Sequence, residues 1–261
     1  MVRARGPAGM DVVQGSALGR TVRFHPEQDG QTWLGLLGVD LDVVPGAYTL
    51  SVDGSRLGSP AASGRTELTV APRRFATRRL TVDSRFVEPP SSEEARIVDE
   101  AIRLTALFEG VTPRHWAGPF QRPVVARPTS NFGARSVFNG QPRNPHAGVD
   151  FRGATGTPIA ASNAGTVVLA EDLYFTGQTV VLDHGLGLYS LHAHLSRLQV
   201  ARGDVVAAGQ TLGLLGATGR VTGPHLHWAV RLNGARVDPM SLLAATAALA
   251  TQIATTGARP L

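Results

Sequence analysis

Apolar and polar residues alternate in short runs over the first 80 residues of the chain, which is the pattern of β-strands. The runs at 21–24, 47–52, 66–70 and 78–82 are separated by turn-forming pairs: Pro45-Gly46, Asp53-Gly54 and Ala71-Pro72. Strands at this spacing predict a small, β-sandwich-like domain over residues 1–90. His25 stands alone in this segment, so we expect no reaction centre there.

A helical pattern interrupts the strands over residues 91–109. Ser91 and Glu94 have the spacing of a capping box, and Gly110 stands where the helix would end. The residues expected on the packing stripe recur at helical spacing and are Ile97, Val98, Ala101, Ile102, Thr105 and Phe108. We interpret the segment as a packing helix that, with the Pro-rich connector after it, links two domains through residues 91–118.

Strand and turn patterns return over residues 119–240. The runs at 160–170, 179–183 and 205–215 predict strands, and Asp238 followed by Pro239 is a typical helix start. The Ala-rich residues 241–261 then predict a C-terminal helix and tail. No run reaches the 18 or so apolar residues that a membrane-spanning helix needs. The fold class predicted for the chain is therefore mainly β.

Composition narrows the chemistry. The 261 residues contain no Cys, which excludes disulfides, thiolate catalysis and Cys-based metal sites. All 25 basic residues are Arg, which excludes lysine Schiff bases, a phosphate-binding P-loop and a lipoyl-type carrier. The net charge of +5 would suit an anionic partner. However, the densest basic cluster, at residues 73–79, has no interleaved stacking aromatics, so we interpret it as a solvated face and predict no nucleic-acid binding.

The candidate chemistry lies between residues 146 and 227, which hold six of the eight histidines. In HLHWAVRL (225–232), strand alternation places His225 and His227 on one face and the apolar residues on the other. The two imidazoles would then lie about 7 Å apart at their Cα atoms and point the same way. One ring could bind a metal while the other works beside it, although two incidental surface histidines would explain this motif alone equally well.

Two further motifs carry histidines. In PHAGVDFRG, His146 and Asp150 would lie about 13 Å apart on a straight strand, but Gly148 offers a place to bend. Asp150 sits between two apolar residues, and a buried carboxylate needs a compensating partner such as a metal. In LYSLHAHLS, alternation predicts that His192 and His194 face the same side of a strand. Each motif alone is weak, and the last could be an ordinary wet sheet face.

Together the three motifs resemble the signature of the lysostaphin-type (LytM-like) zinc metallopeptidases, which is H-x-x-x-D, then a Y-x-H-L-type histidine, then H-x-H. The resemblance covers about residues 118–240, including GTPIAASNAGTVV and GDVVAAGQTLGLLGATGRVTGPHLHW. It implies a LytM-type antiparallel β-sheet catalytic domain over residues 119–240. It further implies that Zn²⁺ is bound by His146, Asp150 and His227, with His194 and His225 as catalytic histidines. His192 stands where the family often has Tyr, which leaves its role open, and His184 is expected to be structural.

The activity that this resemblance implies is zinc-dependent endopeptidase hydrolysis of the peptide cross-links of bacterial peptidoglycan, through metal-activated water and two assisting histidines. The alternative is a catalytically silent LytM-like regulator that activates another cell-wall hydrolase. Both imply a periplasmic or secreted protein, although MVRARGPAGM has no signal-peptide pattern. Residues 1–90 resemble the β-rich domain of some Gram-negative members, which could position substrate, block the groove or bind a protein regulator. Glycyl bridges and D-alanyl–diaminopimelate cross-links both remain open as the bond cleaved.

Overall fold

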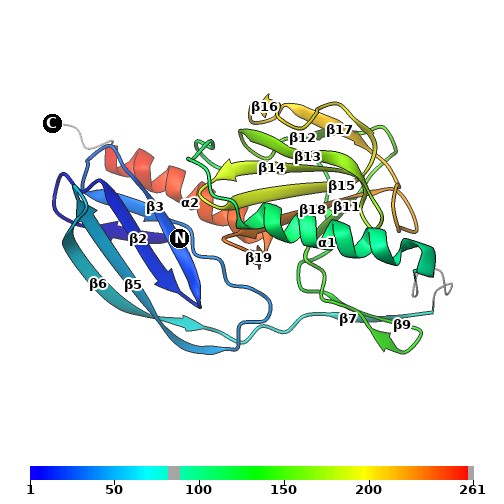
Figure 1. The fold of residues 1–261 in the computed structure, drawn as a ribbon, viewed down its shortest axis with the longest axis horizontal. Helices are drawn as coiled ribbons and strands as arrows, with labels where there is room; N and C mark the ends of the chain where they lie inside the picture. The colour runs from blue at the N-terminus through cyan, green and yellow to red at the C-terminus, as the bar shows by residue number, and fades with distance from the viewer. Residues whose placement is uncertain (82–88, 258–261) are drawn as a thin grey trace. The chain divides into compact units, whose positions relative to one another are not determined.

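The computed structural model describes residues 1–81 and 89–257, and most of its regular structure is strand, as the sequence predicts (Figure 1). The chain divides into two compact units, Met1–Arg74 and Phe75–Leu261. Within the described residues, no helix is both long enough and apolar enough to cross a membrane.

The first unit is a six-stranded antiparallel sheet with the strand order β1-β4-β3-β2-β5-β6. Its strands are β1 (Val2–Arg5), β2 (Val12–Ala17), β3 (Arg20–Pro26), β4 (Thr32–Gly35), β5 (Gly46–Arg56) and β6 (Ser59–Val70). Alternate apolar residues, including Val22, Trp33 and Leu50, form its core. The turn predicted at Asp53-Gly54 is wrong, because both residues lie inside β5, where a bulge follows Gly54.

The second unit is built on a ten-stranded antiparallel sheet, whose main path is β16-β13-β14-β15-β18-β11-β8. Its strands are β8 (Pro128–Ser130), β11 (Gly148–Arg152), β12 (Pro158–Ala160), β13 (Gly165–Leu173), β14 (Gly177–Gly185), β15 (Leu188–Leu198), β16 (Val205–Val206), β17 (Thr211–Leu215), β18 (His225–Leu232) and β19 (Ala235–Val237). The single strand predicted over 205–215 is thus two strands, separated by a turn at Gly209, where φ is +80°. The strand predicted from residue 160 begins only at Gly165.

A separate three-stranded sheet of the same unit joins β10 (Gln141–Pro142), β9 (Arg135–Phe138) and β7 (Thr77–Leu80). The strand predicted at 78–82 corresponds to β7. Residue 82 of that prediction lies outside the described residues. Strand β7 pairs in parallel with β9 and therefore belongs to the second unit, not with the N-terminal strands.

The predicted helix forms a short 3₁₀ turn, Ser91–Glu93, followed by α1 (Glu94–Glu109). The prediction of a capping box is wrong, because no side chain makes a capping hydrogen bond at the start of the 3₁₀ turn or of α1. The helix does end before Gly110, whose N–H donates to the carbonyl of Leu107 at 3.3 Å.

Helix α1 packs on the sheet of the second unit through a stripe that only partly matches the predicted one, since Phe108 belongs to both. Leu104, Leu107 and Phe108 contact the core cluster that includes Tyr189 and Ala229. By contrast, two residues of the predicted stripe, Val98 and Ile102, are 57% and 64% exposed. The buried stripe runs instead through Glu100, whose carboxylate accepts hydrogen bonds from Arg96 at 2.7 Å and from the N–H of Tyr174 at 2.9 Å.

The C-terminal helix α2 (Pro239–Gly257) begins where the sequence predicts. The N–H of Met240 donates to the Asp238 carboxylate at 3.0 Å, so Asp238 caps the helix and Pro239 fills its first turn. Trp116, in the Pro-rich connector, is buried against Phe120, which confirms the packing role expected of that segment.

Candidate active site

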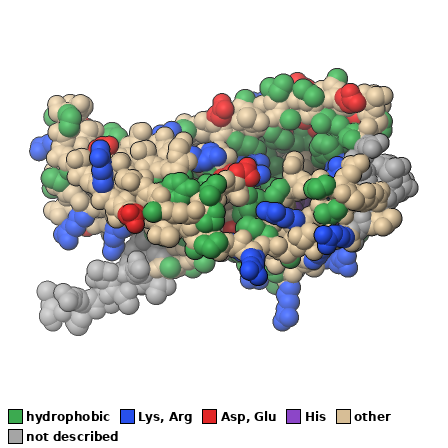
Figure 2. Space-filling view, turned by 90° about the horizontal axis from the view of Figure 1, so that it is seen from below, with side chains coloured by type: hydrophobic (Ala, Val, Ile, Leu, Met, Phe, Trp, Pro, Cys, Tyr) green, Lys and Arg blue, Asp and Glu red, His purple; other side chains and the backbone are tan. Residues whose placement is uncertain are grey.

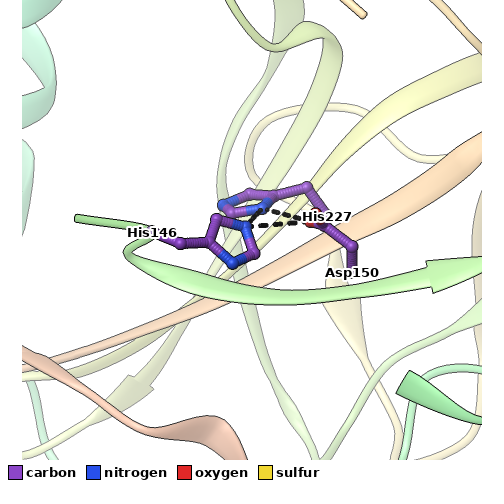
Figure 3. A group of neighbouring side chains, drawn as sticks. All are labelled: His146, Asp150 and His227. Atoms are coloured by element: carbon purple, nitrogen blue, oxygen red, sulfur yellow. Dashed lines mark hydrogen bonds and ion pairs between the residues drawn. The ribbon is translucent and has the colours of Figure 1, made fainter. Parts of the chain in front are cut away.

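Three side chains from two segments that are distant in sequence converge on one point of the second unit (Figure 3). His146 Nε2 lies 3.0 Å from Asp150 Oδ1 and 3.0 Å from His227 Nδ1, and the last two atoms are 2.9 Å apart. The three atoms therefore form a nearly equilateral triangle. These are the residues that the resemblance implies as metal ligands.

Strand pairing accounts for this convergence. Asp150 on β11 lies directly opposite His227 on β18, so both side chains project from the same face of the sheet. His146 lies in the segment just before β11 and reaches the same face. Gly148 makes the close approach possible, because a Cβ at this position would meet the carbonyl of Trp228 and lie 2.8 Å from His227 Cε1. Gly148 is therefore required for packing in addition to the bend that the sequence predicts there.

The protonation of the triangle favours a cation at its centre. His146 Nδ1 lies 3.1 Å from the carbonyl of Asn131, which can only accept, so Nδ1 carries a proton. Nε2 can then either carry a second proton and donate it to Asp150 or, in the neutral ring, offer its lone pair to a cation. Burial lowers the pKa of His146, but its hydrogen bond and charge attraction to Asp150 outweigh burial and raise the pKa overall. Burial likewise raises the pKa of Asp150, yet hydrogen bonds from both histidines hold it below its ordinary value.

This donor set fits Zn²⁺. Two imidazole nitrogens and one carboxylate oxygen are ordinary zinc ligands, and three protein ligands leave a fourth tetrahedral position open, as in catalytic sites. Ligands bound at about 2.0–2.1 Å in a tetrahedron lie about 3.3 Å apart, close to the observed triangle. The contact of His146 Nδ1 with a backbone carbonyl is also the usual support for a metal-binding histidine.

His194 reaches the same site through an irregularity of β15. Three residues of β15 lie opposite two residues of β14 at this point, which is a β-bulge. His194 has φ of +64°, a left-handed conformation that is uncommon for residues other than Gly. The bulge turns its ring toward β18, where the ring centroids of His194 and His225 are 4.7 Å apart and those of His194 and His227 are 6.1 Å apart.

His192 lies on the other face of the sheet, so the expectation that it shares a face with His194 is wrong. It is paired with Trp228, on the face opposite that of His227, and is fully buried. Its Nε2 lies 3.5 Å from the Ser162 hydroxyl, and burial lowers its pKa to about 3. His192 is thus a neutral core residue on the far side of the sheet from the triangle.

Backbone carbonyls hold the two remaining site histidines by their Nδ1 atoms. His194 Nδ1 donates to the carbonyl of Thr218 at 3.0 Å, and His225 Nδ1 donates to that of Gly223 at 2.8 Å. Both carbonyls belong to the loop that precedes β18. The His225 Nε2 is 4.0 Å from Asp150 Oδ1. Burial, followed by the charges of His227 and His225, lowers the pKa of His194 to about 3, so its ring is neutral at neutral pH.

Thr218 is a contributor that sequence reasoning missed. Besides its carbonyl contact to His194, its hydroxyl donates to the carbonyl of Leu195 at 2.7 Å and accepts from the N–H of Gln178 at 2.9 Å. Nothing in TGRVTG distinguishes this threonine, because its partners come from β14 and β15. His184, by contrast, has the structural role expected of it, since it is buried and bonded to the Ala164 carbonyl and the Ser190 hydroxyl, each at 2.7 Å.

Comparisons with known proteins agree with this arrangement. The model of peptidase family M23 matches residues 144–239. A crystal structure of a Pseudomonas aeruginosa protein assigned to that family is 31% identical, with a TM-score of 0.73, and the match covers 94% of this chain and 93% of that one.

Two curated relatives match the C-terminal part of the chain. The peptidoglycan DD-endopeptidase ShyA of Vibrio cholerae is 42% identical over 125 residues, which is 46% of this chain and 29% of the relative. The DD-carboxypeptidase/endopeptidase Mpg of Neisseria meningitidis is 38% identical over 119 residues, which is 46% of this chain and 27% of the relative. The matched regions thus span less than a third of these relatives.

Proposed function

This chain belongs to peptidase family M23, and on that premise we propose that it is a zinc-dependent endopeptidase that hydrolyses peptide cross-links of bacterial peptidoglycan. The observation that carries the proposal is the convergence of His146, Asp150 and His227 with two further histidines at one place on the sheet. The names of ShyA and Mpg support the substrate class.

His146, Asp150 and His227 would hold the metal. When bound, Zn²⁺ supplies a Lewis acid that lowers the pKa of a bound water toward 7 and polarises a carbonyl oxygen. The half-buried, ionised carboxylate of Asp150 contributes the negative charge of the ligand set, and the backbone carbonyl at His146 Nδ1 fixes the orientation of that ring.

His194 and His225 would move protons. With Nδ1–H committed to a backbone carbonyl, each neutral ring keeps an unprotonated Nε2. Such a nitrogen can accept a proton from the attacking water and later donate it to the leaving amine. In its protonated form the same ring donates a hydrogen bond that stabilises the developing oxyanion.

The proposed division of labour assigns this chemistry to residues 119–240. Residues 91–118 then support the sheet, and residues 241–261 form the C-terminal helix and tail. Residues 1–90 would act on access to the site or bind a protein regulator. We also propose action in the periplasm or outside the cell, where peptidoglycan lies. The catalytically silent regulator is the weaker proposal, because it has no use for five site residues placed together.

Digestion of purified peptidoglycan tests the proposal. We expect the full chain to cut the cross-links, so that cross-linked fragments are converted into monomers that can be identified by mass. A chelator should abolish the release, and added Zn²⁺ should restore it. Unchanged peptidoglycan in the presence of zinc-loaded protein would reject the enzymatic proposal and favour the regulator. The same experiment names the bond, since the masses distinguish a cut glycyl bridge from a cut D-alanyl–diaminopimelate link.

A further inference from the structure

Three segments of the second unit that border the candidate site carry arginines. Arg78 lies on β7, Arg143 lies three residues before His146, and Arg220 lies in the loop before β18. In the space-filling view, blue side chains are scattered over both the left and the right of the face shown (Figure 2). Since the chain has no Lys, all of these blue groups are arginines.

Arg78 is fixed beside the metal-binding residues on the β8 side. Its guanidinium donates to the carbonyl of Thr129 at 3.1 Å, and the Thr129 hydroxyl in turn donates to the carbonyl of Asp150 at 3.2 Å. The next residue, Ser130, pairs with Asp150 across the two strands. The charge of Arg78 is therefore held close to His146 and Asp150 by two successive hydrogen bonds.

Arg220 is fixed on the side of the catalytic histidines. Its N–H donates to the carbonyl of Phe175 at 3.0 Å, and its guanidinium carbon lies 4.4 Å from the centre of the Phe175 ring. It sits between Thr218 and Gly223, whose carbonyls hold the two histidines. Burial lowers the pKa of Arg220, and the positive charge of Arg143 lowers it further.

The arginines on α1 provide a contrast. Arg96 and Arg103 each bind two or more carboxylates at distances of 2.6–3.8 Å. Among the described residues, Arg78 and Arg220 form no ion pair with a carboxylate. Within the described part of the chain, neither guanidinium is therefore neutralised by a carboxylate, and Asp150, the acidic residue of the site, is already engaged by two histidines.

We propose that Arg78 and Arg220 form an anion-binding rim that selects a cross-link with a free carboxylate beside the scissile bond. This inference rests on the proposed function and deepens it, because it favours the D-alanyl–diaminopimelate link over the neutral glycyl bridge. A guanidinium binds a carboxylate through charge-assisted hydrogen bonds, which are roughly twice as strong as those between neutral groups. The stacked Phe175 ring pre-orders Arg220 for this contact.

Matched substrates test the rim. Full-length, zinc-loaded protein is given two synthetic cross-linked peptides that differ only in whether the diaminopimelate carboxyl next to the scissile amide is free or amidated. We expect kcat/KM to be roughly 10- to 100-fold higher for the free acid, the range of one hydrogen bond to a charged group. Arg220→Gln and Arg78→Gln should each reduce this ratio, because each should lower kcat/KM for the free acid more than for the amide. Arg220→Lys, which keeps the charge, should restore part of it.

Arg114 supplies the control, because it stacks on Trp116 as Arg220 stacks on Phe175. The next residue, His115, donates its backbone N–H to the carbonyl of His184, which precedes β15. Arg114→Gln should leave the ratio unchanged, and zinc per chain should be the same in every variant. Equal rates of the wild-type protein on acid and amide would overturn the inference. So would an Arg220→Gln protein that slows both substrates equally, since that result would assign Arg220 to loop shape.

Direct binding separates this inference from the proposed function. Calorimetry with the free-acid and amidated product peptides should show preference for the acid that depends on Arg220. If this preference is present but no peptide is hydrolysed, the rim stands and the enzymatic proposal falls. If single-stranded DNA binds the rim and the acid is not preferred to the amide, the rim is a general polyanion surface and the inference is wrong.

Discussion

Acid should unfold the second unit through a histidine that lies outside the candidate site. His184 is fully buried, and its two ring nitrogens are satisfied in the neutral form by the Ala164 carbonyl and the Ser190 hydroxyl. Burial, opposed in part by the Ala164 carbonyl, lowers the pKa of His184 to about 4 from an ordinary value of 6.5. The unfolded chain therefore binds a proton at His184 more readily than the folded protein does.

The sign and the size of the change in the free energy of unfolding follow from this difference in pKa. His184 does not weaken the fold above pH 6.5, where both states are neutral, and its effect grows as the pH falls toward 4. By linkage, the free energy of unfolding drops by about 2 kcal/mol at pH 5 and by about 3 kcal/mol below pH 4. His192, whose pKa is lowered to about 3, adds a loss of the same sign over the same range.

Urea denaturation at pH 8, 7, 6 and 5 measures this effect, with a chelator present because zinc binding has its own pH dependence. The comparison is between the wild-type protein and His184→Gln, which cannot gain a proton. Loss of packing against Phe120 will lower the stability of the variant at every pH. The informative quantity is therefore the slope of the free energy of unfolding against pH. The variant should lose about 2 kcal/mol less than the wild type between pH 8 and pH 5. If the free energy of unfolding falls equally in both proteins between pH 8 and pH 5, the reasoning is refuted.

Three further predictions concern the site and its support. Gly148→Ala should lower zinc affinity at least tenfold by displacing His227, as measured by competition with a chromogenic chelator, while the circular dichroism spectrum stays unchanged. Thr218→Val should reduce kcat roughly tenfold without changing KM or zinc content, whereas Thr218→Ser should keep wild-type rates because it retains the hydroxyl bonds. A chain shortened to begin at Phe75 should fold and bind zinc, but one beginning at Pro119 should melt at much lower temperature. The second deletion removes the packing of α1, and each fully buried apolar side chain contributes roughly 1.5–3 kcal/mol.

Strand alternation predicted those parts of the site where the strands are regular. On β18 it placed His225 and His227 on one face, and the structure agrees, because residues 226, 228, 230 and 232 are all buried on the other. The same rule failed on β15, because the bulge at His194 shifts the alternation by one residue. A left-handed non-glycine residue has no signature in the sequence, so the separation of His192 from His194 could not be foreseen.

The packing face of α1 was predicted only in part, for a different reason. The stripe that packs on the sheet passes through Glu100, and hydropathy alone counts a glutamate as a solvent-facing position. Its burial depends on Arg96 and on the N–H of Tyr174, which lies 74 residues away in sequence. Contacts of this range also explain why Thr218 was missed.

Zinc content measured beside hydrolysis rate, for His225→Ala and His227→Ala, tests the central claim most directly. The two residues lie two positions apart on one face of β18, yet only His227 belongs to the triangle of candidate ligands. We predict that His227→Ala loses most of its zinc and its activity together. His225→Ala should keep about one zinc per chain while its turnover falls roughly 10²–10⁴-fold, as expected when a positioned acid–base group is removed. An empty site in His225→Ala with a filled one in His227→Ala would reverse the assignment, and full zinc and activity in both would place the reaction centre elsewhere.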